Sequence, residues 1–185
     1  MYKTYLNQII KSARKKEKVN FEKIIEFYLK KKQEQLLKMP NKEKSRLLIS
    51  KFNYEERSKM KSSELLGFKV KVGDICYIDF GRAFVSEAGY QHFAIIIGYC
   101  NSKALIVPMS SNSKMYYQSY CEKTFKHGKK HLYRLPELNG LNKKSVLFLN
   151  DVKFINTARI IQVKGHISPD SFLFKDIKNR FIELI

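Results

Sequence analysis

The sequence lacks the features that would take it into a membrane or hold it together by disulfides. No stretch approaches the roughly 20 consecutive apolar residues that span a bilayer, and residues 1–18 carry polar side chains every few positions. The three cysteines, Cys76, Cys100 and Cys121, form no CxxC pair, which argues against a disulfide framework or a zinc knuckle. We therefore expect a cytoplasmic protein with reduced thiols and no membrane partner.

Several catalytic motifs are also missing. The sequence contains no phosphate-cradling glycine loop, no HExxH motif and no cluster of His, Cys and acidic residues at the spacing of metal ligands. It has no GxSxG nucleophile elbow, so serine esterase chemistry has no support. These absences argue against a metal-dependent hydrolase, and we predict neither a metal nor a cofactor.

Acidic residues are scarce relative to basic ones. The 185 residues include 36 Lys or Arg but only 17 Asp or Glu, for a formal net charge of +19 at pH 7. The sequence is basic on both sides of Gly73. A charge of this size predicts an anionic partner, while a hydrophobic content of 44% predicts a chain that folds around a core.

Residues 1–66 have the pattern of a basic helical extension. Glycine is absent before Gly67, and apolar residues at spacings of three and four predict a helix that Pro40 ends. We expect Asn41 to cap a second helix and Ser62 to begin a short turn that Gly67 ends. The apolar stripe of the first of these helices consists of Phe21, Ile24, Ile25, Tyr28, Leu29 and Leu36, and an earlier helix is expected around residues 5–10.

From residue 67 onward, short apolar runs rich in Ile, Val, Phe and Tyr predict buried strands. Residues 100–103 are short enough for a hairpin turn, and Ser168-Pro169-Asp170 predict the first turn of a C-terminal helix. The sequence thus indicates an α+β fold, a small curved antiparallel β-barrel (residues 67–185) with a C-terminal helix and the N-terminal extension. The predicted strands are residues 75–80, 93–97, 104–107, 146–149 and 155–163.

Reactive side chains gather near the ends of these predicted strands. They are Glu87, Gln91 and His92 before one strand, Ser110, Ser111 and Lys114 after the next, and Asp151 with Lys153 farther on. His92 has a residue type suited to proton transfer near neutrality, but by type alone a solvent-facing or structurally bonded histidine is favoured. The two serines by themselves read as turn residues.

A basic, aromatic stretch follows. Tyrosines alternate there with lysines, and this is the composition of a groove for single-stranded nucleic acid, because cations track phosphates and rings stack on bases. Packing of half of the tyrosines into the core is an equally good interpretation. The residues that we expect to contact RNA are Arg82, Gln91, Tyr116, Tyr117, Lys126, Lys129, Lys130 and Lys153.

Three blocks of the sequence, in order and in register, resemble the opening of the MazF/PemK ribonuclease toxins. The resemblance extends from Val70 to Ile185. A downstream block, Phe148–Ile155, fits as well. The three blocks are Val72–Phe80, Ser86-Glu87 followed by Phe93–Gly98, and Val107–Ser111.

This resemblance implies an SH3-like, MazF/CcdB-like barrel and a metal-independent endoribonuclease. Such an enzyme cuts single-stranded, mRNA-like RNA by attack of a ribose 2′-OH, leaving a 2′,3′-cyclic phosphate and a 5′-OH. The family's usual arginine before the strand is replaced here by His92, which makes His92 the favoured acid or base. Ser110 keeps the hydroxyl of the family's usual threonine, and Glu87, Ser111 and Lys114 complete the catalytic site that the resemblance implies.

The blocks around Pro108 and Asp151 are also similar to the ToxN/AbiQ and CptN toxins, which folded RNA antitoxins hold inactive in type III toxin–antitoxin systems. Because the basic charge exceeds what a short cleavage site needs, we expect an RNA antitoxin in preference to a protein one. A non-catalytic, CcdB-like toxin and a basic RNA-binding protein are the alternatives. The sequence leaves open whether residues 1–66 cover the barrel, bind RNA or form a homo-oligomer or a toxin–RNA hetero-oligomer.

Overall fold

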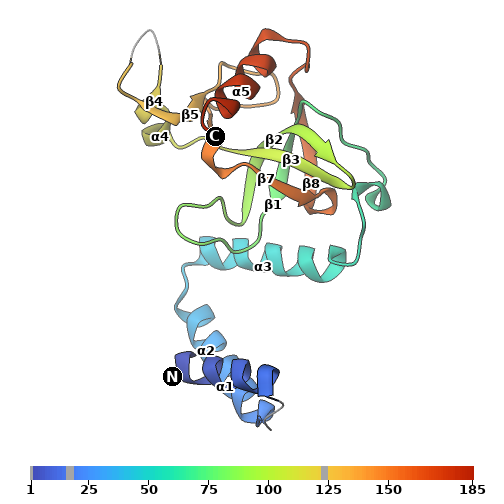
Figure 1. Cartoon of the computed structure of the whole chain (residues 1–185), viewed down its shortest axis with the longest axis vertical. Helices are drawn as coiled ribbons and strands as arrows, with labels where there is room; N and C mark the ends of the chain where they lie inside the picture. Colours follow the sequence, from blue (N-terminus) through green and yellow to red (C-terminus); the bar gives the residue numbers. More distant parts are fainter. Residues whose placement is uncertain (1, 16–18, 122–124) are drawn as a thin grey trace. The chain divides into compact units, whose positions relative to one another are not determined.

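The computed structural model describes residues 2–15, 19–121 and 125–185 (Figure 1). Contacts between residues divide the chain into two compact units, Met1–Ser45 and Arg46–Ile185. The division lies inside helix α3 (Asn41–Arg57), earlier than the boundary between residues 66 and 67 that the sequence suggested. The greater part of α3 therefore packs with the strands that follow it.

The first unit contains the helices α1 (Tyr2–Lys15) and α2 (Phe21–Lys38). The Asn20 side chain caps α2 by accepting a hydrogen bond from the backbone N–H of Lys23 at 3.0 Å. The helix ends at Lys38, just before Pro40, as the sequence predicts. The rings of Tyr5 and Phe27 lie 4.8 Å apart between their centroids, so α1 packs against α2.

The second unit is built around one sheet with strand order β4-β5-β6-β3-β2-β1-β8, in which β7 also pairs with β3. All of the predicted apolar runs lie wholly or largely in strands. Asn101, at the β2–β3 hairpin, has a positive φ of 53°. The strands are β1 (Asp74–Asp79), β2 (Gln91–Cys100), β3 (Lys103–Ser110), β4 (Ser119–Tyr120), β5 (Lys129–Arg134), β6 (Val146–Phe148), β7 (Lys153–Asn156) and β8 (Ile160–His166).

The sheet differs in two ways from the predicted antiparallel barrel. Strands β4 and β5 pair in parallel, whereas every other pairing is antiparallel. Within residues 2–15, 19–121 and 125–185, no strand pairing joins the two ends of the sheet. The sheet is therefore open by hydrogen bonding, although the α+β class is correct.

Alternation along the central strands places apolar side chains on both faces. One face carries Ile75, Ile95 and Val107, which pack with Phe174 and Ile177 of helix α5 (Phe172–Ile182). The other carries a second cluster of buried side chains, Cys76, Ile78, Ala94, Ile96, Ala104, Ile106, Ile155 and Ile160. Burial on both faces explains why these strands read as nearly continuous apolar runs.

Two expected elements begin or break at other residues. The run 155–163 is not one strand, because the Asn156 side chain accepts a hydrogen bond from the N–H of Ala158 and caps the short helix η3 (Thr157–Arg159). Helix α5 is capped by Ser171, not by Ser168, since the N–H of Ser171 donates to the carbonyl of Ser168 in a preceding turn. The other short helices are η1 (Ser63–Leu66), α4 (Ser113–Gln118) and η2 (Leu149–Asp151).

None of the helices within the described ranges is long and apolar enough to cross a membrane.

Candidate functional site

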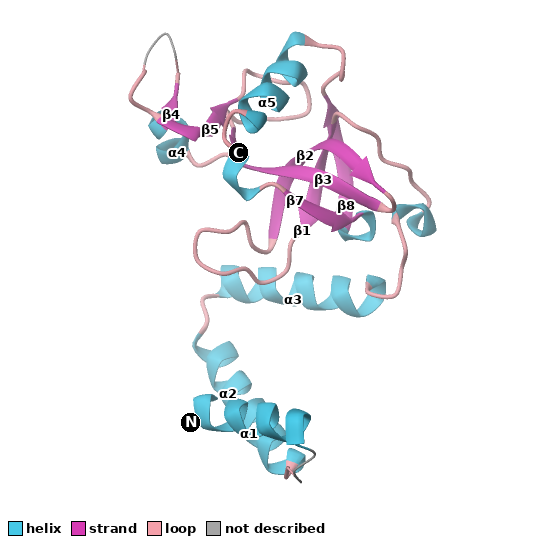
Figure 2. Ribbon diagram, in the orientation of Figure 1, coloured by secondary structure: helices cyan, strands magenta, loops and turns pink. Residues whose placement is uncertain are grey.

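The loop that joins β1 to β2, residues 80–90, is tied down at its base and exposed at its tip (Figure 2). The backbone N–H of Phe80 donates to the carbonyl of Tyr90 at 2.8 Å. At the tip, the side chains of Phe84 and Val85 are 86% and 95% exposed. Glu87, a predicted site residue, is exposed and accepts a hydrogen bond from the N–H of Phe84 at 3.2 Å.

Asp151 fastens this loop to the following strand. Its Oδ2 accepts a hydrogen bond from the N–H of Ala88 at 2.7 Å, and its Oδ1 lies 2.6 Å from Nζ of Lys153. The Lys153 ammonium also lies 5.5 Å from the centroid of the Phe80 ring, within the range of a cation–π contact. Residues from the loop, η2 and β7 therefore meet at one point.

A cavity of about 250 Å³, here called the loop cavity, opens beside this point. Three residues that the sequence predicts to belong to the functional site, Arg82, Glu87 and Lys153, line it together. It also contains Arg159, which no sequence pattern marked, and the side-chain charges around it are three cations and one carboxylate. Its full lining is Phe80, Arg82, Ala83, Glu87, Ala88, Lys153, Phe154, Ile155 and Arg159.

His92 lies at the start of β2, where it pairs with Ile78 of β1. Burial lowers the pKa of His92 below its ordinary value, and the nearby charge of Arg46 lowers it further. A hydrogen bond with the Met109 backbone and the charge of Asp151 act in the opposite direction on this pKa. The net lowering keeps the imidazole neutral at pH 7, so that it is available to accept a proton.

Ser110 lies at the end of β3, near His92. Phe93 pairs with Met109 in the β2–β3 ladder, so His92 and Ser110 are both one residue beyond that pair, on neighbouring strands. The Oγ of Ser110 accepts a hydrogen bond from the N–H of Asn112 at 3.2 Å. Directly opposed positions on neighbouring strands have Cβ atoms about 4.5–5.5 Å apart. The His92 imidazole and the Ser110 hydroxyl therefore belong to the same end of the β2–β3 pair.

Ser111 and Lys114 are exposed, beyond the end of β3. The Asn112 side chain accepts a hydrogen bond from the N–H of Lys114 at 2.9 Å, which caps α4. Neither residue lines the loop cavity. Their predicted catalytic roles thus stay predictions.

Gln91 is buried, with only 5% of its surface exposed. Its amide nitrogen donates to the carbonyl of Arg46 at 3.1 Å, to Oγ of Ser50 at 2.9 Å and to Oδ1 of Asp79 at 3.2 Å. The amide therefore serves to join α3 to the ends of β1 and β2. The predicted contact of Gln91 with RNA stays a prediction. Arg46, whose carbonyl accepts this bond and whose charge acts on the pKa of His92, is a residue that the sequence did not mark.

The remaining predicted RNA-binding residues lie on α4, on β5 and in the segment between them. The Tyr116 ring is covered by the Arg134 guanidinium at 4.7 Å from its centroid, while Tyr117 is 69% exposed. Lys129 donates to the side chain of Gln118 at 3.1 Å, and Lys126 and Lys130 are exposed. One tyrosine is thus held by an arginine, and its neighbour is available for stacking.

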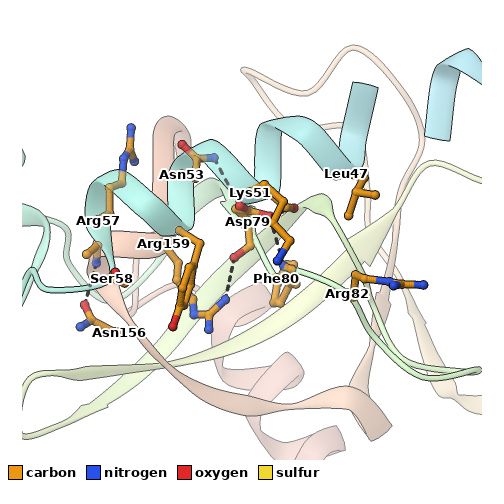
Figure 3. A pocket seen from close by; sticks show the side chains of 14 residues that line it. Leu47, Lys51, Asn53, Arg57, Ser58, Asp79, Phe80, Arg82, Asn156 and Arg159 are labelled. Atoms are coloured by element: carbon orange, nitrogen blue, oxygen red, sulfur yellow. Dashed lines mark hydrogen bonds between the residues drawn. The ribbon is translucent and has the colours of Figure 1, made fainter. Parts of the chain in front are cut away.

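A second cavity, here called the helix cavity, lies between α3 and the ends of β1, β7 and η3 (Figure 3). It has a volume of about 440 Å³. It shares Phe80, Arg82 and Arg159 with the loop cavity. Its lining is Leu47, Ser50, Lys51, Asn53, Tyr54, Arg57, Ser58, Asp79, Phe80, Gly81, Arg82, Asn156, Ala158 and Arg159.

Within the part of the chain that the structure describes, no three His, Cys, Asp or Glu side chains form a group that could hold a metal ion. The chemical groups that the site offers are an imidazole, hydroxyls, carboxylates and fixed cations. These suffice for proton transfer beside an anionic substrate.

No family model matches this chain, and no curated protein matches it. Solved structures do. The chain is similar to MazF (Form-I) from Deinococcus radiodurans, with 12% identity and a TM-score of 0.46 over 63% of this chain and 96% of that one. It is similar to the MazE–MazF complex (Form-II) from the same organism, with 12% identity and a TM-score of 0.43 over the same shares.

A third similar structure is an endoribonuclease in complex with its cognate antitoxin from a mycobacterial species. The identity is 9% and the TM-score 0.39, over 62% of this chain and 90% of that one. The two Deinococcus structures contain MazF, which belongs to the family that the sequence resembles. All three TM-scores lie below 0.5.

Proposed function

We propose that the chain is the toxin of a toxin–antitoxin system and a metal-independent endoribonuclease that cuts single-stranded RNA. The observation that carries the proposal is the position of His92. It lies at the start of β2, where the charges of Arg46 and Asp151 act on its pKa, and Asp151 also pairs with Lys153, one of the three cations that line the loop cavity. Cleavage of a phosphodiester without a metal needs a proton-transfer group and cations for the phosphate, and Asp151 connects the two here.

In the proposed reaction, the ribose 2′-oxygen forms a bond to the adjacent phosphorus and loses its proton to a base. The bond from phosphorus to the 5′-oxygen breaks, and that oxygen takes up a proton. The products are a 2′,3′-cyclic phosphate and a 5′-OH, with no water consumed and no electrons transferred. Negative charge on the phosphate oxygens rises in the transition state, so that nearby cations and donors lower the barrier.

We assign the base to His92, because a lowered pKa makes its neutral form dominant at pH 7. Lys153, Arg82 and Arg159 supply the cations, since all three line the loop cavity. The hydroxyl of Ser110, one strand away from His92, serves as a donor to the phosphate. Glu87 lines the same cavity but is a carboxylate, and we place it near the ribose hydroxyls and away from the phosphate.

The antitoxin is proposed to be RNA. The formal charge of +19 is larger than one cleavage site needs to bind its substrate. A folded RNA would neutralise the excess positive charge. Purification of the toxin with its native operon tests this point by the ratio of absorbance at 260 and 280 nm. An elevated ratio supports an RNA antitoxin, and a protein-like ratio with a small acidic polypeptide contradicts it.

The activity is tested by incubating single-stranded RNA with the purified chain in EDTA, beside the His92→Ala variant. We expect the wild-type chain to cut and the variant to cut at least about a hundredfold more slowly, the size of effect that loss of a general base produces. Intact RNA with the wild-type chain would contradict the proposal. A CcdB-like toxin, which acts on a protein target, would give that result.

A further inference from the structure

The helix cavity combines two kinds of wall. Helix α3 contributes Lys51, Tyr54 and Arg57 to one wall. The loop of residues 80–90 contributes Phe80 and Arg82 to the other, and η3 contributes Arg159. Figure 3 shows Lys51, Asn53 and Arg57 on α3, with Asp79, Phe80 and Arg82 on the segment that faces the helix. The wall from α3 (Asn41–Arg57) lies outside residues 70–185, the part of the sequence that resembles MazF.

The charge that this cavity presents to solvent is positive. Four of its lining residues are cationic, Lys51, Arg57, Arg82 and Arg159, and Asp79 is its one carboxylate. Asp79 is only 4% exposed. Its carboxylate accepts hydrogen bonds from Ser50, Asn53, Gln91 and the N–H of Gly81, so its charge is balanced by donors within the fold.

Two of the arginines are held in place by backbone carbonyls. Nη1 of Arg57 donates to the carbonyl of Ile160 at 3.1 Å, and Nη1 of Arg159 donates to the carbonyl of Asp79 at 3.2 Å. Each of these bonds uses one of the five N–H donors of a guanidinium. The fixed geometry lowers the entropic cost of binding an anion.

Aromatic surface lies beside these cations. Tyr54 is 64% exposed on α3, and Phe80 is half-buried on the strand side. Among the described residues, no side-chain hydrogen bond of Lys51 or Tyr54 occupies the groups that would meet a ligand. Cations interleaved with rings fit single-stranded RNA, whose phosphates bind cations and whose bases stack on aromatic side chains.

The size and position of the helix cavity fit one nucleotide next to the cleavage site. Its volume of about 440 Å³ lies within the range of about 300–1,000 Å³ for small-molecule sites. Phe80, Arg82 and Arg159 line both this cavity and the loop cavity. A strand with its scissile phosphate at the loop cavity would therefore pass directly into the helix cavity.

We propose that the helix cavity is a subsite for a nucleotide that flanks the scissile phosphate of single-stranded RNA, with Tyr54 against the base and Lys51 against the phosphate. This inference rests on the proposed function, which supplies the RNA. It gives α3 a role as an RNA-binding element of the enzyme. The subsite determines how tightly the strand is held, while His92 determines whether it is cut.

The test uses the full chain with His92→Ala, so that RNA stays intact, and a labelled single strand of about ten nucleotides, within the usual footprint of such sites. Fluorescence anisotropy gives the dissociation constant at several salt concentrations. The subsite variants are Lys51→Ala and Tyr54→Ala. The matched controls are Lys42→Ala, an exposed lysine of the same helix outside the cavity, and Tyr28→Ala, an exposed tyrosine of α2.

We expect Tyr54→Ala to weaken binding about tenfold, the loss typical of one stacked base, and Tyr54→Phe to bind within about twofold of the parent because the ring remains. Lys51→Ala should lower the slope of log K against log salt by about 0.7, one phosphate contact on a single strand. The two controls should change neither quantity.

Equal losses in the controls, or unchanged binding in both subsite variants, would overturn the inference. If the wild-type chain cuts RNA while the subsite variants bind like the parent, the subsite is wrong and the proposed function stands. If the chain neither binds nor cuts RNA, both are wrong.

Discussion

Oδ1 of Asp151 lies 2.6 Å from Nζ of Lys153, while Oδ2 of the same carboxylate accepts the N–H of Ala88 at 2.7 Å. The Asp151 side chain is largely buried, at 12% exposure, and that of Lys153 is 31% exposed. One carboxylate thus fixes the loop of residues 80–90 and positions a cation at the loop cavity. It also acts on the pKa of His92, which connects the loop to the proposed proton transfer.

Substitutions of Asp151 and Arg46 should move the pH profile in opposite directions. Asp151→Asn removes a negative charge that raises the pKa of His92, so this pKa should fall. Arg46→Gln removes a positive charge that lowers it, so the pKa should rise. Since His92 acts as a base in its neutral form, the acidic limb of kcat/KM against pH should move to lower pH in the first variant and to higher pH in the second.

An NMR titration of the His92 ring in both variants checks the assignment of that limb. Shifts of the limb in the same direction, or a limb that does not follow the ring titration, would show that His92 is not the base. Thermal unfolding of each variant controls for loss of the fold.

Chemical rescue distinguishes a catalytic His92 from a structural one. His92→Ala should cut RNA at least about a hundredfold more slowly with an unfolding midpoint near that of the wild-type chain, because the ring is only partly buried. Added imidazole should restore part of the rate, since the base can then enter from solution. A variant that is inactive, folded and unaffected by imidazole would count against the proton-transfer role.

The buried hydroxyl of Ser50 should matter for stability. It donates to Asp79 at 2.5 Å and accepts from the Gln91 amide at 2.9 Å. Ser50→Ala leaves both groups short of a partner, so we expect a loss of about 1–3 kcal/mol in the free energy of unfolding, measured with urea. Ser45→Ala, at an exposed hydroxyl of the same helix, should change it by less than about 0.5 kcal/mol, and an equal loss there would refute the assignment.

Gly73 is required both for its backbone conformation and for the space around it. Its φ is +93°, and an added Cβ would collide with the carbonyl oxygen of Ile167. We expect Gly73→Ala to reduce the free energy of unfolding by more than about 3 kcal/mol. Gly67 has a φ of +82° but nothing within 4 Å of an added Cβ. Gly67→Ala should therefore reduce the free energy of unfolding by only about 1–2 kcal/mol. Equal losses would mean that the predicted collision is relieved by movement.

Local patterns predicted most of the elements and none of the contacts that join them. The apolar runs around Ile75, Ile95 and Val107 become the central strands because burial on both faces demands continuous apolar residues. The prediction of one strand over residues 155–163 was wrong, because the short helix η3 interrupts it. The Asn156 side chain caps that helix through a local hydrogen bond, which a hydropathy pattern does not reveal. The sequence also could not show that the two ends of the sheet stay unpaired within the described residues. Whether two strands pair depends on contacts between distant residues, which the spacing of apolar residues does not reveal.

The candidate site was predictable only in part. His92, Arg82, Glu87 and Lys153 lie near strand ends, where chemistry is expected, and all but His92 line the loop cavity. Arg46 acts on the pKa of His92, and its carbonyl accepts a hydrogen bond from Gln91, 45 positions along the chain. No periodicity predicts such a bond, which is also why the helix cavity could not be foreseen.

The chemistry of the RNA ends tests the central claim most directly. The purified chain is incubated with a single-stranded RNA in EDTA, and the new termini are identified by mass spectrometry and by treatment with a cyclic phosphodiesterase. We predict a 2′,3′-cyclic phosphate on one fragment and a 5′-OH on the other, as attack by the ribose 2′-OH requires. Intact RNA, or fragments that end in a 3′-OH, would contradict this account.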